Sequence, residues 1–198
     1  GRALRTGLAR AAADGHVAAV TLDADGQHPP AEAARLARLG LSPGSLVLGI
    51  RDLKGAGAPR PNQISNAISN GFLSLFSRRL LTDTQCGLRR YPLPRVLEIG
   101  GPSAGGAFPA EDTPPPGPAR GATAVHSSSP MANDGYAFEA EIILLAIAAG
   151  VDVVEVPIEV VYPEDRTTHF DSVRDPMRVV RRVVSTLVST RGITRSAV

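Results

Sequence analysis

The hydrophobic residues near the start of the chain change from helical spacing to a short continuous run. Leu4, Leu8 and Ala12 recur at helical intervals and Gly15 follows them, which predicts a helix that ends at this glycine. The next segment, "HVAAVTL" at residues 16–22, is short, apolar and rich in β-branched side chains. This composition predicts a strand that is buried on both faces.

The alternation of helix and strand continues beyond this first strand. Two prolines suited to a first helical turn precede "AEAARLARL" (31–39), which predicts a helix before a second buried strand at 44–52. The order strand, helix, strand predicts a parallel pair with a right-handed crossover. The pattern then predicts a Gly/Pro loop (52–61), a helix (62–81), a loop leading into a strand (82–91) and a short helix (92–101). The helix at 62–81 has its large apolar residues at helical spacing: Ile64, Ile68, Phe72, Leu75, Phe76 and Leu80.

Residues 101–134 have a different composition from the rest of the chain. They hold seven of the 17 prolines and few large apolar side chains, which predicts a disordered or mobile insert. A helix (135–150), a strand (151–162) in which Pro157 favours an edge or a bulge, and a final helix (177–191) follow. The chain thus divides into residues 1–100, the insert 101–134 and residues 135–198, and the alternating elements predict an α/β fold with three layers.

Composition narrows the possible classes of protein. The 198 residues suffice for one domain, and 43% hydrophobic with 20% charged residues is typical of a soluble globular chain. The net charge of +2 gives no argument for a nucleic-acid partner. Lys54 is the only lysine, so arginine supplies the other basic residues. Base composition of the genome is the favoured explanation for this excess, ahead of phosphate binding. Cys86 stands alone, which excludes a disulfide framework and favours a reducing compartment.

The most informative segment is "VTLDADGQHPP" (20–30), where an apolar run ends at Asp23 and Asp25. Strand ends are where α/β proteins bind ligands, and two carboxylates in a turn containing Gly26 can share one hard divalent cation. An EF-hand is excluded, because the glycine stands at the fourth loop position and not the sixth. Capping of turn amides by the two aspartates remains an alternative to metal binding.

Five segments together resemble one enzyme family. "VTLDADGQHPP" resembles the Asp-X-Asp segment of family 2 glycosyltransferases, in the polyprenyl-phosphate branch typified by dolichol-phosphate mannosyltransferase. The segments "GRALRTGLARA", "VLGIRD", "TDTQCGLRRY" and "GYAFEAEIILLAIAAGVDVVEVPIEVVY" with "THFDSVRDPMRVV" fall in the order of that branch. The match covers nearly everything except 101–134, with Leu88 in place of the usual aromatic residue. The resemblance implies a mostly parallel sheet of the nucleotide-diphospho-sugar transferase (GT-A, Rossmann-like) type.

The resemblance also implies a reaction and a metal site. Such enzymes transfer a hexose, with inversion, from a nucleotide sugar of the GDP-mannose or UDP-glucose type to a polyprenyl or dolichyl phosphate. Asp23, Asp25 and Gln27 would then hold Mg²⁺ or Mn²⁺ against the donor diphosphate, since a divalent ion neutralises the charge that the leaving group gains. Asp83 would lie near the acceptor as the catalytic aspartate, and a turn cap within "TDTQ" is the alternative.

Several basic residues match positions that bind phosphate in this branch. Arg51 and Arg89 would clamp the acceptor phosphate, although each can instead form a surface ion pair. Arg60 is a further candidate whose register in the family is less certain. Arg166 and His169 would close over the donor phosphates, and an ordinary loop histidine is the alternative for His169.

A lipid-phosphate acceptor requires contact with a membrane. The helix at 177–191 has an apolar stripe opposite Arg178, Arg181 and Arg182, which suits a membrane surface, although packing on the sheet is the alternative. With no span long enough to cross a bilayer in the sequence, the expected location is cytoplasmic, peripheral at the inner face of the membrane.

Two segments of the family are not found in this chain. They are the Val-Pro-x-Tyr-Asn-Glu and Asp-Asp-x-Ser strand ends, which hold the nucleotide in the branch. The comparison therefore predicts an N-terminally truncated domain. A non-catalytic fragment or accessory module is the alternative function, whereas a dinucleotide oxidoreductase is disfavoured because no Gly-x-Gly-x-x-Gly follows a strand.

Overall fold

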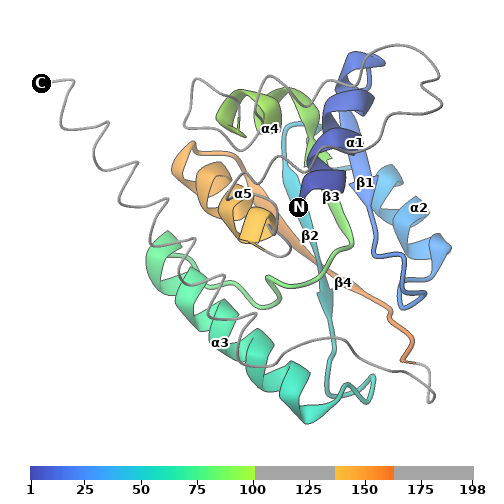
Figure 1. Ribbon diagram of the computed structural model, residues 1–198, viewed down its shortest axis with the longest axis vertical. Coiled ribbons are helices and arrows are strands. Elements are labelled where there is room, and N and C mark those ends of the chain that lie inside the picture. The colour runs from blue at the N-terminus through green and yellow to red at the C-terminus, as the bar shows by residue number, and fades with distance from the viewer. Residues whose placement is uncertain (101–136, 163–198) are drawn as a thin grey trace, which may run out of the picture.

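The computed structural model describes residues 1–100 and 137–162 (Figure 1). Arg166, His169, the insert at 101–134 and the helix expected at 177–191 therefore lie outside the described residues, as does the start of the helix expected from residue 135. The helices are α1 (Arg2–Ala13), α2 (Pro30–Arg38), α3 (Arg60–Ser77), α4 (Leu93–Gly100) and α5 (Ala137–Ala148), and the strands are β1 (Ala18–Thr21), β2 (Leu46–Arg51), β3 (Arg89–Pro92) and β4 (Val153–Ile158). Each element that the sequence predicted in these ranges is present.

The four strands form one mixed sheet in the order β1-β3-β2-β4. β2 and β4 pair in parallel, whereas β3 is antiparallel to both β1 and β2. The direct parallel pairing predicted for the first two strands is therefore wrong: they run in the same direction, but β3 lies between them. β4 is an edge strand of this sheet, as Pro157 favoured. The α/β class is confirmed, with a sheet that is mixed in its pairing.

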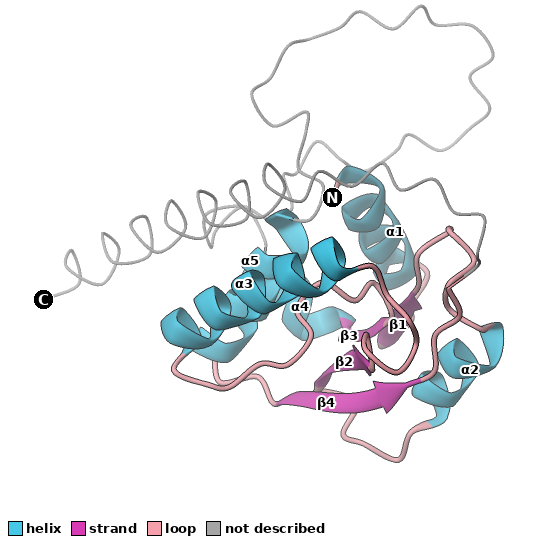
Figure 2. Cartoon of the chain, turned by 90° about the horizontal axis from the view of Figure 1, so that it is seen from below, coloured by secondary structure: helices cyan, strands magenta, loops and turns pink. Residues whose placement is uncertain are grey.

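Helices cover both faces of the sheet (Figure 2). Successive residues of β2 point to opposite faces, so Leu46 and Leu48 enter a large core with residues of α1, α4 and α5. Val47, between them, enters a smaller core with Leu36 of α2. The sheet thus forms the middle of three layers, and its strand ends are left for the loops that carry the candidate site.

Helix α3 is present as predicted, but it buries an unexpected face. The buried side chains of this helix are Ser65, Asn66, Ser69 and Leu73. Most of its apolar stripe is exposed instead, and only Phe72 of that stripe packs partly against the large core. Helix α5 shows the opposite arrangement, because its apolar residues are mostly buried.

Candidate functional site

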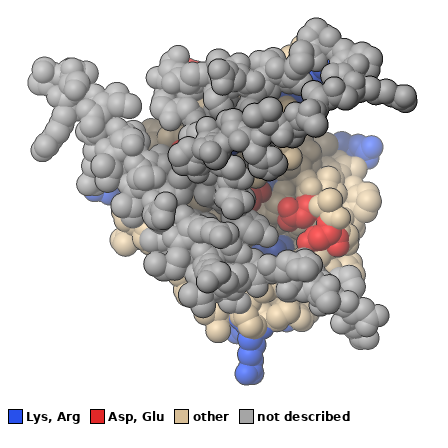
Figure 3. Space-filling view, viewed as in Figure 1, with Lys and Arg blue, Asp and Glu red and all other residues tan. Residues whose placement is uncertain are grey.

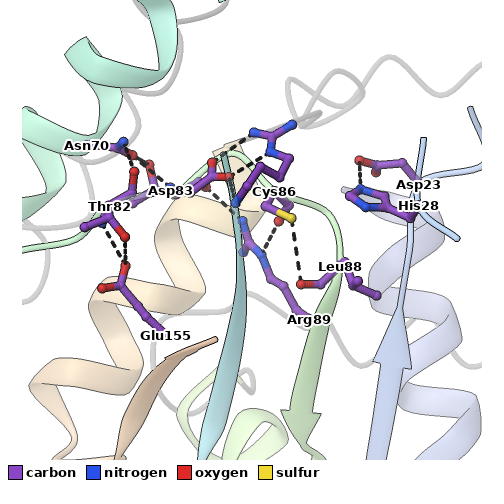
Figure 4. Close-up of polar contacts among 11 residues, drawn as sticks. Asp23, His28, Asn70, Thr82, Asp83, Cys86, Leu88, Arg89 and Glu155 are labelled. Atoms are coloured by element: carbon purple, nitrogen blue, oxygen red, sulfur yellow. Dashed lines mark hydrogen bonds and ion pairs between the residues drawn. The ribbon is translucent and has the colours of Figure 1, made fainter. Parts of the chain in front are cut away.

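The candidate residues come together at one edge of the sheet, where β1 and β2 end and β3 begins. Asp23 follows β1, Arg51 is the last residue of β2, and Asp83 lies in the loop before β3. Because β3 is antiparallel to β1 and β2, its start lies at the same edge of the sheet as their ends. Figure 4 shows Asp83, Cys86 and Asp23 along this edge. Acidic side chains also gather on the surface near β1 and α2 in the view of Figure 3.

Gly87 determines how closely the loop before β3 approaches Asp23. A Cβ atom built on Gly87 would lie 2.2 Å from Oδ1 of Asp23, which is far inside van der Waals contact. The hydroxyl of Thr21, at the end of β1, donates a hydrogen bond of 2.9 Å to the carbonyl oxygen of Gly87. The glycine of "TDTQCGLRRY" is therefore needed for the carboxylate of Asp23 to rest on this loop.

His28 was not among the predicted site residues. Its Nε2 lies 3.6 Å from Oδ2 of Asp23, and its side chain is 1% exposed. Neither ring nitrogen has a hydrogen-bond partner in the part of the chain that the structure describes. The imidazole lowers the pKa of Asp23 against the opposing effect of burial, so this carboxylate is ionised at neutral pH. Its position directly after Gln27 in "DADGQH" is the only sequence signal for this contact.

Asp25 and Gln27 form the turn that follows Asp23. Oδ1 of Asp25 accepts a hydrogen bond of 3.0 Å from the amide of Gln27, and Gly26 takes the positive φ of 77° that such a turn needs. The capping alternative is thus observed for Asp25. A carboxylate has two oxygens with several lone pairs, so this bond is compatible with metal binding. Gln27 is buried, and its backbone carbonyl oxygen accepts a hydrogen bond of 2.9 Å from the amide of Val161.

Asp83 and Arg51 form a buried ion pair. The two oxygens of Asp83 accept hydrogen bonds of 2.7 Å and 2.9 Å from the guanidinium of Arg51, and one also accepts its backbone amide at 3.1 Å. Burial lowers the pKa of Arg51, but the hydrogen bonds and charge of Asp83 outweigh it, so the net pKa is raised. Asp83, 1% exposed, therefore holds Arg51, and within the described ranges no amide of "TDTQ" is seen to donate to its carboxylate.

Arg89 points into the interior and not toward the open edge. Its guanidinium donates hydrogen bonds of 2.8 Å, 3.0 Å and 2.8 Å to the carbonyl oxygens of Cys86, Glu139 and Thr84. The side chain is completely buried, so neither the acceptor clamp nor a surface ion pair describes what it does here. Arg89 fixes the loop before β3 to the first turn of α5. Binding of the acceptor phosphate by Arg89 stays a prediction, which the buried position of the guanidinium does not favour.

Cys86 and Arg60 complete the described candidates. Burial raises the pKa of the Cys86 thiol to about 12, which makes it a poor nucleophile. Arg60 is exposed at the first residue of α3, after the loop that leaves β2. Arg166 and His169 lie outside the described residues.

A cavity of about 810 Å³ lies between α1 and β1 and reaches Asp23. Small side chains of α1, including Gly7 and Ala11, leave this space open. Gly87 and Glu139 line it next to Asp23, and burial raises the pKa of Glu139. The volume of this cavity is in the range of sites that bind small molecules. The small residues of α1 are the sequence signal for this cavity, which was not predicted.

The carboxylates of Asp23 and Asp25 supply only part of a metal coordination shell, and a substrate phosphate would have to supply the rest. Among the described residues, no group of three or more His, Cys, Asp or Glu side chains forms a metal site. Asp23 and Asp25 alone suit Mg²⁺ or Mn²⁺, which commonly bind one or two carboxylates together with substrate phosphates.

Comparisons with protein-family models, with curated proteins and with solved structures returned no match. No helix in the described ranges combines the length and hydropathy needed to cross a bilayer. What fold and site together define is an α/β protein with an open mixed sheet and a polar cluster at one sheet edge.

Proposed function

We propose that the chain belongs to an inverting, metal-dependent glycosyltransferase of the GT-A type, which transfers a hexose from a nucleotide sugar to a polyprenyl phosphate. The observation that carries the proposal is the position of Asp23 and of the Arg51–Asp83 pair at one edge of the sheet, on either side of Cys86 and Gly87. The order of five family-like segments along the sequence supports the same reaction. The cavity beside Asp23 offers room for part of a substrate.

In this proposal the β1 end of the edge binds the donor. Asp23, Asp25 and Gln27 would hold Mg²⁺ or Mn²⁺ against the donor diphosphate, where the ion neutralises the charge on the leaving nucleotide. Asp23 is ionised and held against Gly87, so its carboxylate is ready to bind a cation. His28 keeps this carboxylate in place from the buried side.

The β2 end of the edge would bind the acceptor. Asp83 positions Arg51 through two side-chain hydrogen bonds, so that the guanidinium presents a fixed positive charge to the lipid phosphate. The acceptor phosphate is already an anionic nucleophile, so this step has less need of a strong general base than attack by a hydroxyl has. Asp83 is therefore assigned to positioning Arg51, in place of the direct role that the family comparison implied.

Mn²⁺ binding tests the donor half of the proposal directly. Electron paramagnetic resonance would follow Mn²⁺ titrated into the protein with GDP or UDP present. We expect binding that depends on the nucleotide and that Asp23→Asn weakens by about tenfold or more, since the amide removes a charged ligand of similar shape. Asp52→Asn is the matched control, because this aspartate is exposed and caps the amide of Gly55.

Transfer of a labelled hexose to polyprenyl phosphate tests the reaction itself. Activity that requires Mg²⁺ or Mn²⁺ and that is lost in Asp23→Asn would support the transferase. If the folded protein neither binds Mn²⁺ with nucleotide nor transfers sugar, the non-catalytic module is the better description.

A further inference from the structure

The outward side of α3 and of the turn after it carries large apolar side chains that are exposed. Leu75 and Leu80 are 73% and 79% exposed. The rings of Phe72 and Phe76 lie 4.6 Å apart between centroids, which places an aromatic pair on the same side. We call the following exposed set the apolar face of α3: Ile64, Ile68, Leu75, Phe76 and Leu80. Contiguous exposed apolar surface of this kind marks contact with another molecule or a membrane.

Hydrogen bonds explain why the apolar face of α3 points outward. Oδ1 of Asn70 accepts bonds of 2.8 Å from the amide and from the hydroxyl of Thr84. Nε2 of Gln85 donates a bond of 2.9 Å to Oγ of Ser69, and the amide of Leu81 donates one of 2.9 Å to Oγ of Ser74. These contacts attach the polar side of α3 to residues 81–85, so turning the helix over would break all of them.

The charges on α3 indicate what covers the apolar face. From Arg60 to Ser77 the helix contains no acidic residue. Arg60 stands at its start and Arg78 follows its end, and both are exposed, whereas the guanidinium of the next residue, Arg79, donates a hydrogen bond to the carbonyl oxygen of Val153 in β4. Arginines next to an apolar helix face favour the headgroup region of a bilayer with anionic lipids. We propose that the apolar face of α3 is the surface by which this protein lies on an anionic membrane.

Like charges disfavour the other possible occupants. A second copy of the chain would place α3 against α3, which brings the arginines at the helix ends of one copy close to those of the other. The chain's own residues 177–191 contain several arginines and no acidic residue, so they offer no complementary charge. An anionic lipid surface is the occupant that supplies both an apolar phase and negative charge.

The proposal deepens the proposed function and rests on it for its biological reason, because a lipid-phosphate acceptor lies in a membrane. Asn70 of α3 bonds to Thr84, and its amide donates a 2.5 Å bond to the carbonyl of Thr82, so the helix contacts both sides of Asp83. Contact through α3 would therefore hold the Arg51–Asp83 pair close to the lipid headgroups.

A single tryptophan tests which occupant is present. The chain has no Trp, so Leu75→Trp gives one reporter on the apolar face, and Val17→Trp gives a matched exposed reporter elsewhere. We expect the emission of Leu75→Trp to shift to shorter wavelength with phosphatidylcholine–phosphatidylglycerol vesicles and much less with phosphatidylcholine alone. The Val17→Trp emission should not shift.

Other outcomes of this measurement overturn the proposal. A Leu75→Trp emission that is already at short wavelength without vesicles means that protein covers the face. It would then be a second copy if the shift depends on protein concentration, and the same chain if it does not. No shift with anionic vesicles means that the face does not contact lipid.

Vesicle sedimentation then measures the size of the effect. Leu75→Ser should weaken partitioning onto the anionic vesicles by about tenfold, whereas Val17→Ser should leave it unchanged. Arg60→Glu should weaken it several-fold through lost attraction to anionic lipid, and Arg38→Glu, exposed at the end of α2, is its control. Equal binding of Leu75→Ser and the unchanged protein overturns the proposal.

These vesicles contain neither a sugar donor nor a polyprenyl phosphate. Membrane binding without any transferase activity would therefore reject the proposed function and leave the α3 surface intact. Transferase activity without vesicle binding would support the proposed function and reject the α3 membrane surface.

Discussion

The candidate site has two halves, which differ in how far their polar groups are hydrogen-bonded within the protein. The β1 half contains Asp23 and His28, and the β2 half contains Arg51, Asp83 and Arg89. In the β2 half, Asp83 and Arg51 bond to each other, and Arg89 bonds to three backbone carbonyls. In the β1 half, the side chain of Asp23 is 44% exposed, and His28 is buried without a hydrogen-bond partner among the described residues. The β2 half is therefore built mainly to hold its shape, while the β1 half has binding capacity left for a ligand.

The largest expected effect comes from removing Arg89, the centre of the β2 half. Arg89→Met keeps the buried alkyl volume but leaves three buried carbonyl oxygens without their donor. We expect the free energy of unfolding to fall by about 3 kcal/mol or more, measured by urea denaturation. Arg95→Met removes an exposed arginine paired with Glu98 and should change the stability by less than about 1 kcal/mol. Similar small losses in both variants would show that Arg89 does not support the loop before β3.

A smaller effect on stability, but a clear effect on binding, is expected in the β1 half. Gly87→Ala places a methyl group where the carboxylate of Asp23 now rests, so that carboxylate must move. Mn²⁺ binding in the presence of nucleotide should weaken about tenfold, while unfolding changes by about 1 kcal/mol. Gly71→Ala is the control, because a Cβ there meets nothing within 4 Å. Unchanged Mn²⁺ affinity in Gly87→Ala would separate Asp23 from metal binding.

The smallest expected effect concerns the contact that anchors α2 behind the β1 half. Hydrogen bonding from Arg35 lowers the pKa of Glu32 against the effect of burial, and the amide of Glu159 also donates to it. The ionised form therefore stabilises the fold above the ordinary pKa of 4.5, and this contribution is lost as pH falls through the lower folded value.

Denaturation at several pH values tests the direction of this pH dependence. Glu32→Gln should be slightly less stable than the unchanged protein at neutral pH, and the difference should vanish in acid. A difference that grows as pH falls would mean that the sign is wrong.

The local elements were predictable from sequence, but the strand order was not. The sequence pattern identified each helix and strand in the described ranges, in most cases because an apolar face or run is visible in a single segment. The position of β3 depends instead on contacts with distant residues. Arg90 on this strand reaches the carbonyl oxygens of Leu39 and Ser42, for example, so a polar strand can occupy an interior place in the sheet. Such pairings have no periodic signal.

The same limit applies to α3 and to the site. Apolar spacing identified α3 as an amphipathic helix but not which face is buried, since partners such as Asn70 and Thr84 are far apart in sequence. The aspartates Asp23 and Asp83 were identified from their motifs. The roles of His28 and Gly87 were not predicted, because they arise from a close approach that only the fold creates.

The interior position of β3 has a consequence for the order of folding. β1 and β2 share no hydrogen bonds and are joined only through β3 in the described sheet, which comes after both in the chain. On the ribosome, the edges of β1 and β2 that pair with β3 therefore stay unpaired until Arg89–Pro92 has emerged from the exit tunnel. Until then their apolar edges are open to wrong pairing, so synthesis through this segment is the vulnerable interval for aggregation and the stage at which chaperone binding would matter most.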